Sequence, residues 1–308
     1  MSRLFSAFVM IDWSAAAALR TGKDSIWIGV IKRDIRFRPT FEAFNPATRE
    51  AAMTALDDIL ADLRRRGERA LLGVDFPLGY PEGTAQALNL KQPDWEGMWA
   101  FLASNLVDKP TNVNNRFAVA AKMNRLMTDQ AWPFWGCPAN DAQRWLTTTK
   151  PTDLPEGLPP QFRRTELATQ VGAKGKGKAK GGAKSVWRVF GNGTVGSQAI
   201  VGIPRIKTLM ETMGDKAKVW PFQTGWQPLT PSDISGLEAL IVEVYPGLVK
   251  VEPEPGEVLD RAQVRSLCEH FFKLDDAGDL AAMFGPKAAV SEADRAVVET
   301  EEGWILGG

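Results

Sequence analysis

Apolar and polar residues alternate in short blocks at the start of the chain, a pattern typical of β-strands. We expect strands over 4–14 (LFSAFVMIDWS), which ends at Asp12, over 24–33 (DSIWIGVIKR) and over 36–44 (RFRPTFEAF). The tight Arg-Asp-Ile link between the last two predicts a hairpin. Apolar residues then recur at helical spacing over 47–68, and a fourth strand follows at 70–74. The expected order is β-β-β-α-β, in which the helix makes a right-handed crossover between parallel strands.

The pattern changes over 81–235. Helices are expected at 93–107, 114–129 and 196–213, separated by Pro-rich loops and by a basic, low-complexity run over 171–185 (VGAKGKGKAKGGAKS). Strand character returns at 237–244 and is followed by helices to the end of the chain. The sequence therefore predicts an α/β fold whose core is formed by 1–80 and 236–308. A mainly helical insertion, 81–235, carries the basic Lys/Gly loop.

The composition indicates which class of protein this is, but it does not indicate the function. The 308 residues carry 37 Lys+Arg and 37 Asp+Glu, so net charge predicts no general attraction to nucleic acid. Locally, 167–210 holds eight basic residues and no acid, whereas 213–308 holds 17 acids and eight bases. Two distant cysteines exclude a disulfide framework. We see no signal peptide and no membrane span, and we expect a cytoplasmic protein.

Three expected strands end in the same way, with an apolar run, then a carboxylate, then a turn. The acids are Asp12, Asp75 and Glu243. A carboxylate at the end of a buried strand is costly unless it is paired or bound to a cation. Ligands of open parallel sheets gather at the carboxyl ends of the strands, and Mg²⁺ and Mn²⁺ prefer carboxylate oxygens. We therefore expect these three acids to be ligands of a two-metal site, one that would clamp a phosphodiester.

The order of elements and several motifs resemble the ribonuclease H-like fold. In particular they resemble a prokaryotic family of predicted nucleases known as domain of unknown function 429. The motifs are IDWS near the start, VDFPLG, FRRTE, KSVWRVFGNGTVGSQAIVGIP, VEVYPG and EEGWILGG at the end. The resemblance covers nearly the whole chain and implies metal-dependent phosphodiester chemistry.

The ribonuclease H-like resemblance also implies one more acid on a C-terminal helix. The first choice is Asp279, with Asp276 on the same expected helical face, and Asp294 is the fallback. The catalytic set expected from the sequence is thus Asp12, Asp75, Glu243 and Asp279. The candidates for contact with substrate phosphates or bases are Trp13, Ser14, Arg116, Arg163, Arg164 and Lys184. For Arg163 and Arg164, a structural ion pair with Glu166 is the competing interpretation.

The leading hypothesis is a Mg²⁺- or Mn²⁺-dependent phosphodiester hydrolase acting on nucleic acid or a nucleotide. The alternatives are a non-catalytic nucleotide or nucleic-acid binder on the same fold, a metal-independent glycosidase that also uses two acids, and a role in molybdopterin guanine dinucleotide synthesis. The last is disfavoured because IDWSAAAALRTGK has Asp where a nucleotidyltransferase loop needs glycine. A single histidine, His270, excludes a multi-histidine zinc site.

Overall fold

The chain forms an α/β fold built on one six-stranded mixed sheet. The computed structural model describes residues 3–152, 159–175, 182–191 and 193–308. The strand order is β3-β2-β1-β4-β6-β5. The strands are β1 (Ala7–Asp12), β2 (Trp27–Arg33), β3 (Pro39–Phe44), β4 (Ala70–Val74), β5 (Ala217–Val219) and β6 (Ala239–Glu243). Strands β1, β4, β6 and β5 are parallel, and β2 and β3 add an antiparallel hairpin beside β1.

Eight α-helices are present in the described residues. They are α1 (Arg49–Arg65), α2 (Thr84–Ala87), α3 (Trp95–Asn105), α4 (Arg116–Thr128), α5 (Arg164–Gly175), α6 (Gly196–Met213), α7 (Leu259–Ala277) and α8 (Glu292–Val297). A π-helical turn, Val298–Glu302, continues α8. Of the described helices, none combines the length and the apolar character required to cross a lipid bilayer.

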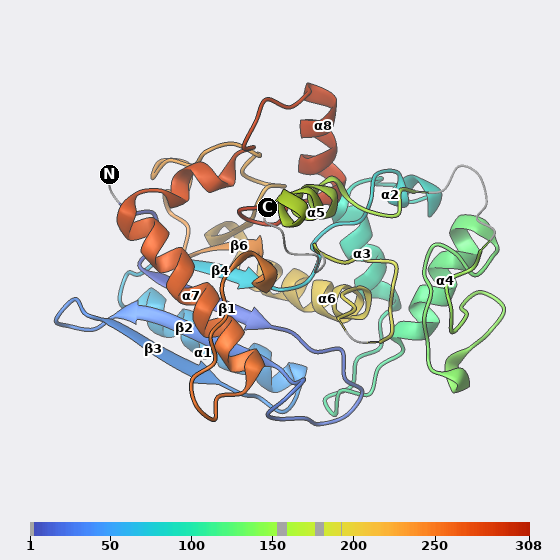
Figure 1. The fold of residues 1–308 in the computed structure, drawn as a ribbon, viewed down its shortest axis with the longest axis horizontal. Coiled ribbons are helices and arrows are strands. Elements are labelled where there is room, and N and C mark those ends of the chain that lie inside the picture. The colour runs from blue at the N-terminus through green and yellow to red at the C-terminus, as the bar shows by residue number, and fades with distance from the viewer. Residues whose placement is uncertain (1–2, 153–158, 176–181, 192) are drawn as a thin grey trace.

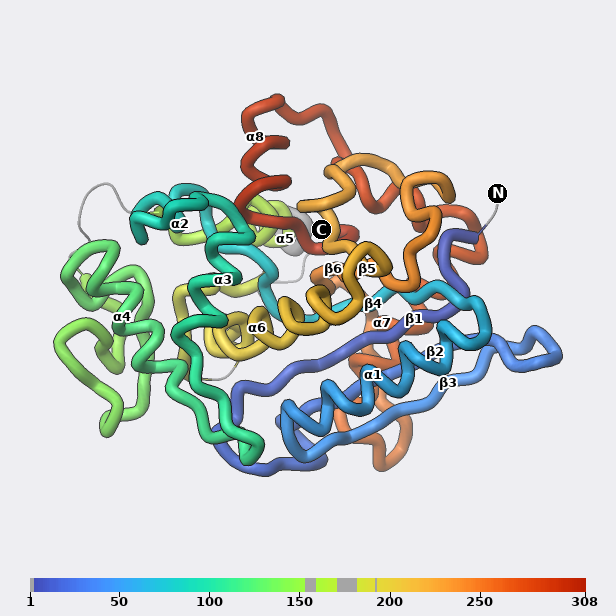
Figure 2. The backbone as a smooth tube through the Cα atoms, turned by 180° about the vertical axis from the view of Figure 1, so that it is seen from behind, coloured from blue at the N-terminus to red at the C-terminus, as the bar shows by residue number. Residues whose placement is uncertain are grey.

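The pleat of the strands divides the interior into two cores. In β1, Ala7, Val9 and Ile11 face one side, whereas Phe8 and Met10 face the other. The first side packs against α1, α3, α4 and α6, and the second packs against α7 and the C-terminal segment. Figures 1 and 2 show this arrangement, with α7 crossing one face of the sheet and α1 and α6 covering the other.

Helix α7 runs across one face of the sheet, from the carboxyl ends of the parallel strands to their amino ends. It follows β6, so its first turn lies near the carboxyl ends of the parallel strands. Its last turns lie near the opposite ends, where the Asp275 carboxylate accepts hydrogen bonds from the backbone N–H of Leu4 and Phe5, both at 2.9 Å. These residues precede β1. The two ends of α7 therefore serve different edges of the sheet.

The expected order β-β-β-α-β is present, but the predicted insertion is not purely helical. Strand β5 lies within 81–235 and pairs with β6 at the edge of the sheet. Helix α6 shares a hydrophobic core with β1 and β4. Of the basic run at 171–185, residues 171–175 belong to helix α5 rather than to a loop, and 176–181 lie outside the described residues.

The expected helix through 274–284 is wrong. Helix α7 ends at Ala277, and Gly278 follows in the left-handed region at φ 82°. A short 3-10 segment, Leu280–Phe284, comes next. Asp276 and Asp279 are therefore not on one helical face.

Candidate functional site

Two of the predicted acids meet at the carboxyl ends of adjacent parallel strands. The register pairs Ile11 of β1 with Val74 of β4, so the next residues along each strand, Asp12 and Asp75, are neighbours. By the alternation of side chains along each strand, both carboxyls are on the face of the sheet that packs against α7. Asp75 Oδ1 accepts the backbone N–H of Trp13 at 2.8 Å, and a hydrogen bond links the Asp12 and Asp75 side chains. The prediction that these two strand ends converge is confirmed.

The acid pair has no ion-pair partner among the described bases. Neither Asp12 nor Asp75 forms an ion pair with a Lys or Arg in the part of the chain that the structure describes. Burial, followed by the charge of Asp75, raises the pKa of Asp12 well above its ordinary value. Burial also raises the pKa of Asp75 to about 7, against the hydrogen bond from Trp13. Two carboxyls this close either share a proton or need a cation.

A third acid, Asp260, joins the pair and was missed by the sequence reasoning. It lies in the first turn of α7, and its charge helps to raise the pKa of both Asp12 and Asp75. Its Oδ2 accepts the backbone N–H of Asp24 at 2.6 Å. Asp24 is a fourth, exposed acid in the link between β1 and β2. The available signal was the direction of the helix, because a helix that follows a parallel strand begins at the carboxyl edge.

Asp279, the first choice for the last acid, is placed elsewhere. It follows the far end of α7, at the opposite edge of the sheet, and is exposed. Asp260 lies in the first turn of the 19-residue helix α7 and Asp279 lies just past its last residue. A helix of this length is about 28 Å long. Asp276 forms a hydrogen bond with Arg33, and Asp294 pairs with Arg164. None of these three can join Asp12 and Asp75.

Glu243 lies on the neighbouring strand but turns away from the pair. The register pairs Glu243 with Val74, one residue before Asp75, and a shift of one residue moves a side chain to the opposite face of a sheet. Arg163 holds the Glu243 carboxylate at 2.6 and 2.8 Å. Glu243 is therefore held in an ion pair on the other face of the sheet, and its role as a metal ligand stays a prediction.

The two adjacent arginines are structural ion-pair partners, which corrects their expected contact with substrate phosphates. The fully buried Arg163 bridges Glu243 and Glu166, whose Oε1 lies 2.5 Å from Nη2. Arg164 binds three acids, which are Glu82, Asp294 and Glu302.

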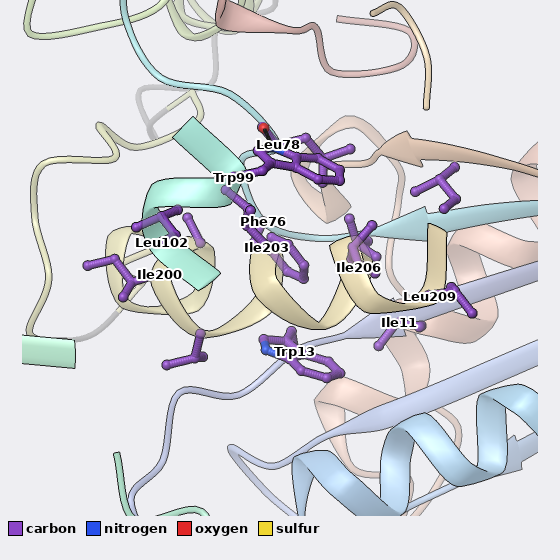
Figure 3. Close-up of a cluster of buried hydrophobic side chains, with 14 of the residues drawn as sticks. Ile11, Trp13, Phe76, Leu78, Trp99, Leu102, Ile200, Ile203, Ile206 and Leu209 are labelled. Carbon is purple, nitrogen blue, oxygen red and sulfur yellow. Dashed lines mark hydrogen bonds between the residues drawn. The ribbon is translucent and has the colours of Figure 1, made fainter. Parts of the chain in front are cut away.

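Trp13 is also structural. Trp13 is only 2% exposed, its ring centre lies 6.0 Å from that of Phe76, and it belongs to the same core as Ile203 of helix α6 (Figure 3). It cannot stack on a base as expected, although its backbone N–H orients Asp75.

Two cavities flank the acids. The first, which we call the acidic cavity, has a volume of about 460 Å³. Its lining includes Asp12, Ser14, Asp24, Asp260, Arg20 and Arg116. The second, of about 430 Å³, is lined by Asp75, Lys184 and Tyr245 among others. Thr194, Gln198 and Gln263 line both, so the two cavities adjoin, and we call them the two lobes of one groove. Of the expected substrate-binding residues, Trp13, Ser14, Arg116 and Lys184 line this groove.

A larger cavity lies elsewhere, between α3, α6 and β5. It has a volume of about 700 Å³ and an aromatic wall formed by Trp95 and Trp99. Of its charged groups, Lys207 and Glu211 pair with each other. Because it contains no cluster of perturbed acids, we assign the functional site to the groove at the strand ends rather than to this larger space.

The acid pair suits a hard divalent cation. Carboxylate oxygens are the available donors, and Mg²⁺ is commonly held by one or two carboxylates, with water and substrate phosphate completing the coordination. In the described residues, no three Asp, Glu, His or Cys side chains are already grouped as a metal centre. The fit therefore rests on Asp12 and Asp75, with Asp260 adding negative charge.

Comparisons with family models, curated proteins and solved structures found no match to this chain.

Proposed function

We propose that the protein is a divalent-cation-dependent phosphodiester hydrolase whose centre is the Asp12–Asp75 pair. One observation carries this proposal: two carboxyls in contact at adjacent parallel strand ends line the two lobes of the groove, and neither has an ion-pair partner among the described bases. Such a pair costs free energy unless a cation neutralises it.

The residues of the chain divide the work as follows. Asp12 and Asp75 hold the cation, and the Trp13 N–H fixes the Asp75 carboxylate through Oδ1. Asp260 strengthens the local negative potential from the first turn of α7. When bound, Mg²⁺ or Mn²⁺ would polarise the phosphate of the substrate and activate a water molecule for attack.

Two observations support this class over the alternatives. The order of the first five elements and the acids on β1, after β4 and on the last long helix agree with the ribonuclease H-like resemblance. The two carboxyls are also in direct contact, whereas the acids of a glycosidase stand apart on either side of the sugar bond. The glycosidase alternative is therefore disfavoured.

The test is a thermal-shift titration with Mn²⁺ and Mg²⁺, followed by an assay of single-stranded nucleic acid cleavage. We expect the wild type to gain melting temperature with millimolar Mn²⁺ and to cleave only with the metal. Asp75→Asn keeps the side-chain volume and should lose both effects. Asp276→Asn is the control, because this acid lies at the other end of α7 and should change neither.

A second candidate is a nucleotide- or nucleic-acid-binding protein without catalysis. The observation in its favour is that no three ligating side chains in the described part of the chain form a complete metal centre. A wild type that binds nucleic acid but gains no stability from either metal would favour this candidate. Equal metal binding by Asp75→Asn and the wild type would refute the metal site.

A further inference from the structure

Arg116 lines the acidic cavity in an unusual state for a partly buried arginine. Its Nε donates to Ser197 Oγ at 3.1 Å and its Nη1 donates to Asn114 Oδ1 at 3.0 Å. Its guanidinium carbon lies 4.2 Å from the centre of the Phe117 ring. In the described residues Nη2 has no hydrogen-bond partner, and no carboxylate pairs with this side chain. The guanidinium is therefore oriented by neutral groups and keeps its full charge available.

The two fully buried arginines are satisfied by carboxylates. Arg49 pairs with Asp108 at 2.6 Å, and Arg163 pairs with Glu166 and Glu243. Arg116 has no such ion pair, and burial lowers its pKa to about 10, with the charge of Arg49 acting in the same direction and the charge of Asp141 opposing it. A desolvated cation without an anion is costly, so an anionic ligand would stabilise it.

The position of Arg116 indicates which anion this is. It lines the same cavity as Asp12 and Asp260, so one wall offers a cation site and another offers a preoriented guanidinium. A group that satisfies both carries several anionic oxygens, as a phosphate does. Arginine matches phosphate geometry through paired N–H donors. The neighbouring lobe, which contains Asp75 and Lys184, leaves room for the part of the ligand that extends beyond this phosphate.

We infer that Arg116 is the phosphate-binding subsite of the groove and that the ligand is a phosphodiester strand extending through both lobes. This inference rests on the proposed function for its cation but makes a separate claim about anion binding.

The experiment measures binding of a short, fluorescein-labelled single-stranded oligodeoxynucleotide by anisotropy, with Ca²⁺ in place of Mn²⁺ and over a range of salt. We expect Arg116→Met to weaken binding about 10- to 100-fold, as loss of a charged hydrogen-bonded contact does. The slope of log Kd against log salt should fall by about 0.7, the value for one phosphate contact on a single strand. Arg116→Lys keeps the charge and should recover part of the affinity.

Arg20→Met is the matched control, because Arg20 lines the same cavity but pairs with Asp24 at 3.7 Å. We expect it to bind the oligonucleotide nearly as the wild type does. Equal losses in Arg20→Met and Arg116→Met would overturn the subsite, as would an Arg116→Met protein that binds with wild-type affinity and salt slope. The Mn²⁺ thermal shift is read in parallel. If Arg116→Met weakens binding while the wild type shows no Mn²⁺ shift, the subsite stands and the proposed metal chemistry fails.

Discussion

Replacing Asp75 by Asn should stabilise the metal-free protein at alkaline pH, although Asp75 lies in the interior of the site. Asn has nearly the same volume, and its Oδ1 can still accept the Trp13 N–H that Asp75 accepts at 2.8 Å. The substitution removes only the charge, and with it the repulsion from Asp12 and Asp260.

The magnitude follows from the pKa of Asp75, which burial raises from an ordinary value of 3.8 to about 7. Below pH 4 the carboxyl is protonated in both the folded and the unfolded chain, so it contributes no pH dependence. Between pH 4 and 7 only the unfolded chain releases the proton, and stability falls as pH rises. Above pH 7 the accumulated cost is on the order of 4 kcal/mol.

The assay is urea unfolding in EDTA at pH 5 and pH 8. We expect wild type and Asp75→Asn to differ little at pH 5 and Asp75→Asn to be more stable at pH 8, by up to about 4 kcal/mol. Glu243→Gln is the matched control at the same sheet edge. It should destabilise by about 2–3 kcal/mol, because Arg163 loses a charged partner. An Asp75→Asn protein less stable than wild type at pH 8 would refute the reasoning.

The remaining predictions concern two ion pairs. Arg163→Met should cost about 3–5 kcal/mol in urea unfolding at pH 7, because it leaves Glu166 and Glu243 buried without a base; a loss below 1 kcal/mol would contradict this. The hydrogen bond from Arg265, opposed by partial burial, lowers the pKa of Glu257 from 4.5 to about 2. Its contribution, at most roughly 3 kcal/mol, is present above pH 4.5 and lost as pH falls towards 2. Glu257→Gln should remove this acid dependence, and an unchanged profile between pH 4.5 and 2 would argue against it.

The strand-end acids illustrate what the sequence could predict. Apolar runs that end in carboxylates correctly indicated that β1, β4 and β6 are neighbours and that Asp12 meets Asp75. The pattern did not contain the register between strands. Glu243 is offset by one residue relative to Asp75, and this offset alone sends it to the other face.

Long-range pairing limited the rest of the prediction. Glu243 is ion-paired with Arg163, 80 residues away, a partner that no local pattern identifies. From the sequence alone, Asp260 and Asp279 are equally good candidates for the third acid of the site. Only the direction of α7 along the sheet separates them, because its first turn lies at the strand ends that carry Asp12 and its last turns lie at the start of β1.

The segment around Glu302 has a consequence for the folding pathway. Its carbonyl accepts from Arg163, and the N–H of Leu306 donates to the carbonyl of Glu243 at 2.9 Å. Residues separated by 139 positions must therefore meet before the charges beneath β6 are satisfied. During synthesis on a ribosome, β6 and Arg163 emerge well before this segment. Their hydrogen bonds to Glu302 and Leu306 cannot form until the segment has emerged. Such high contact order predicts slow closure of this half of the sheet.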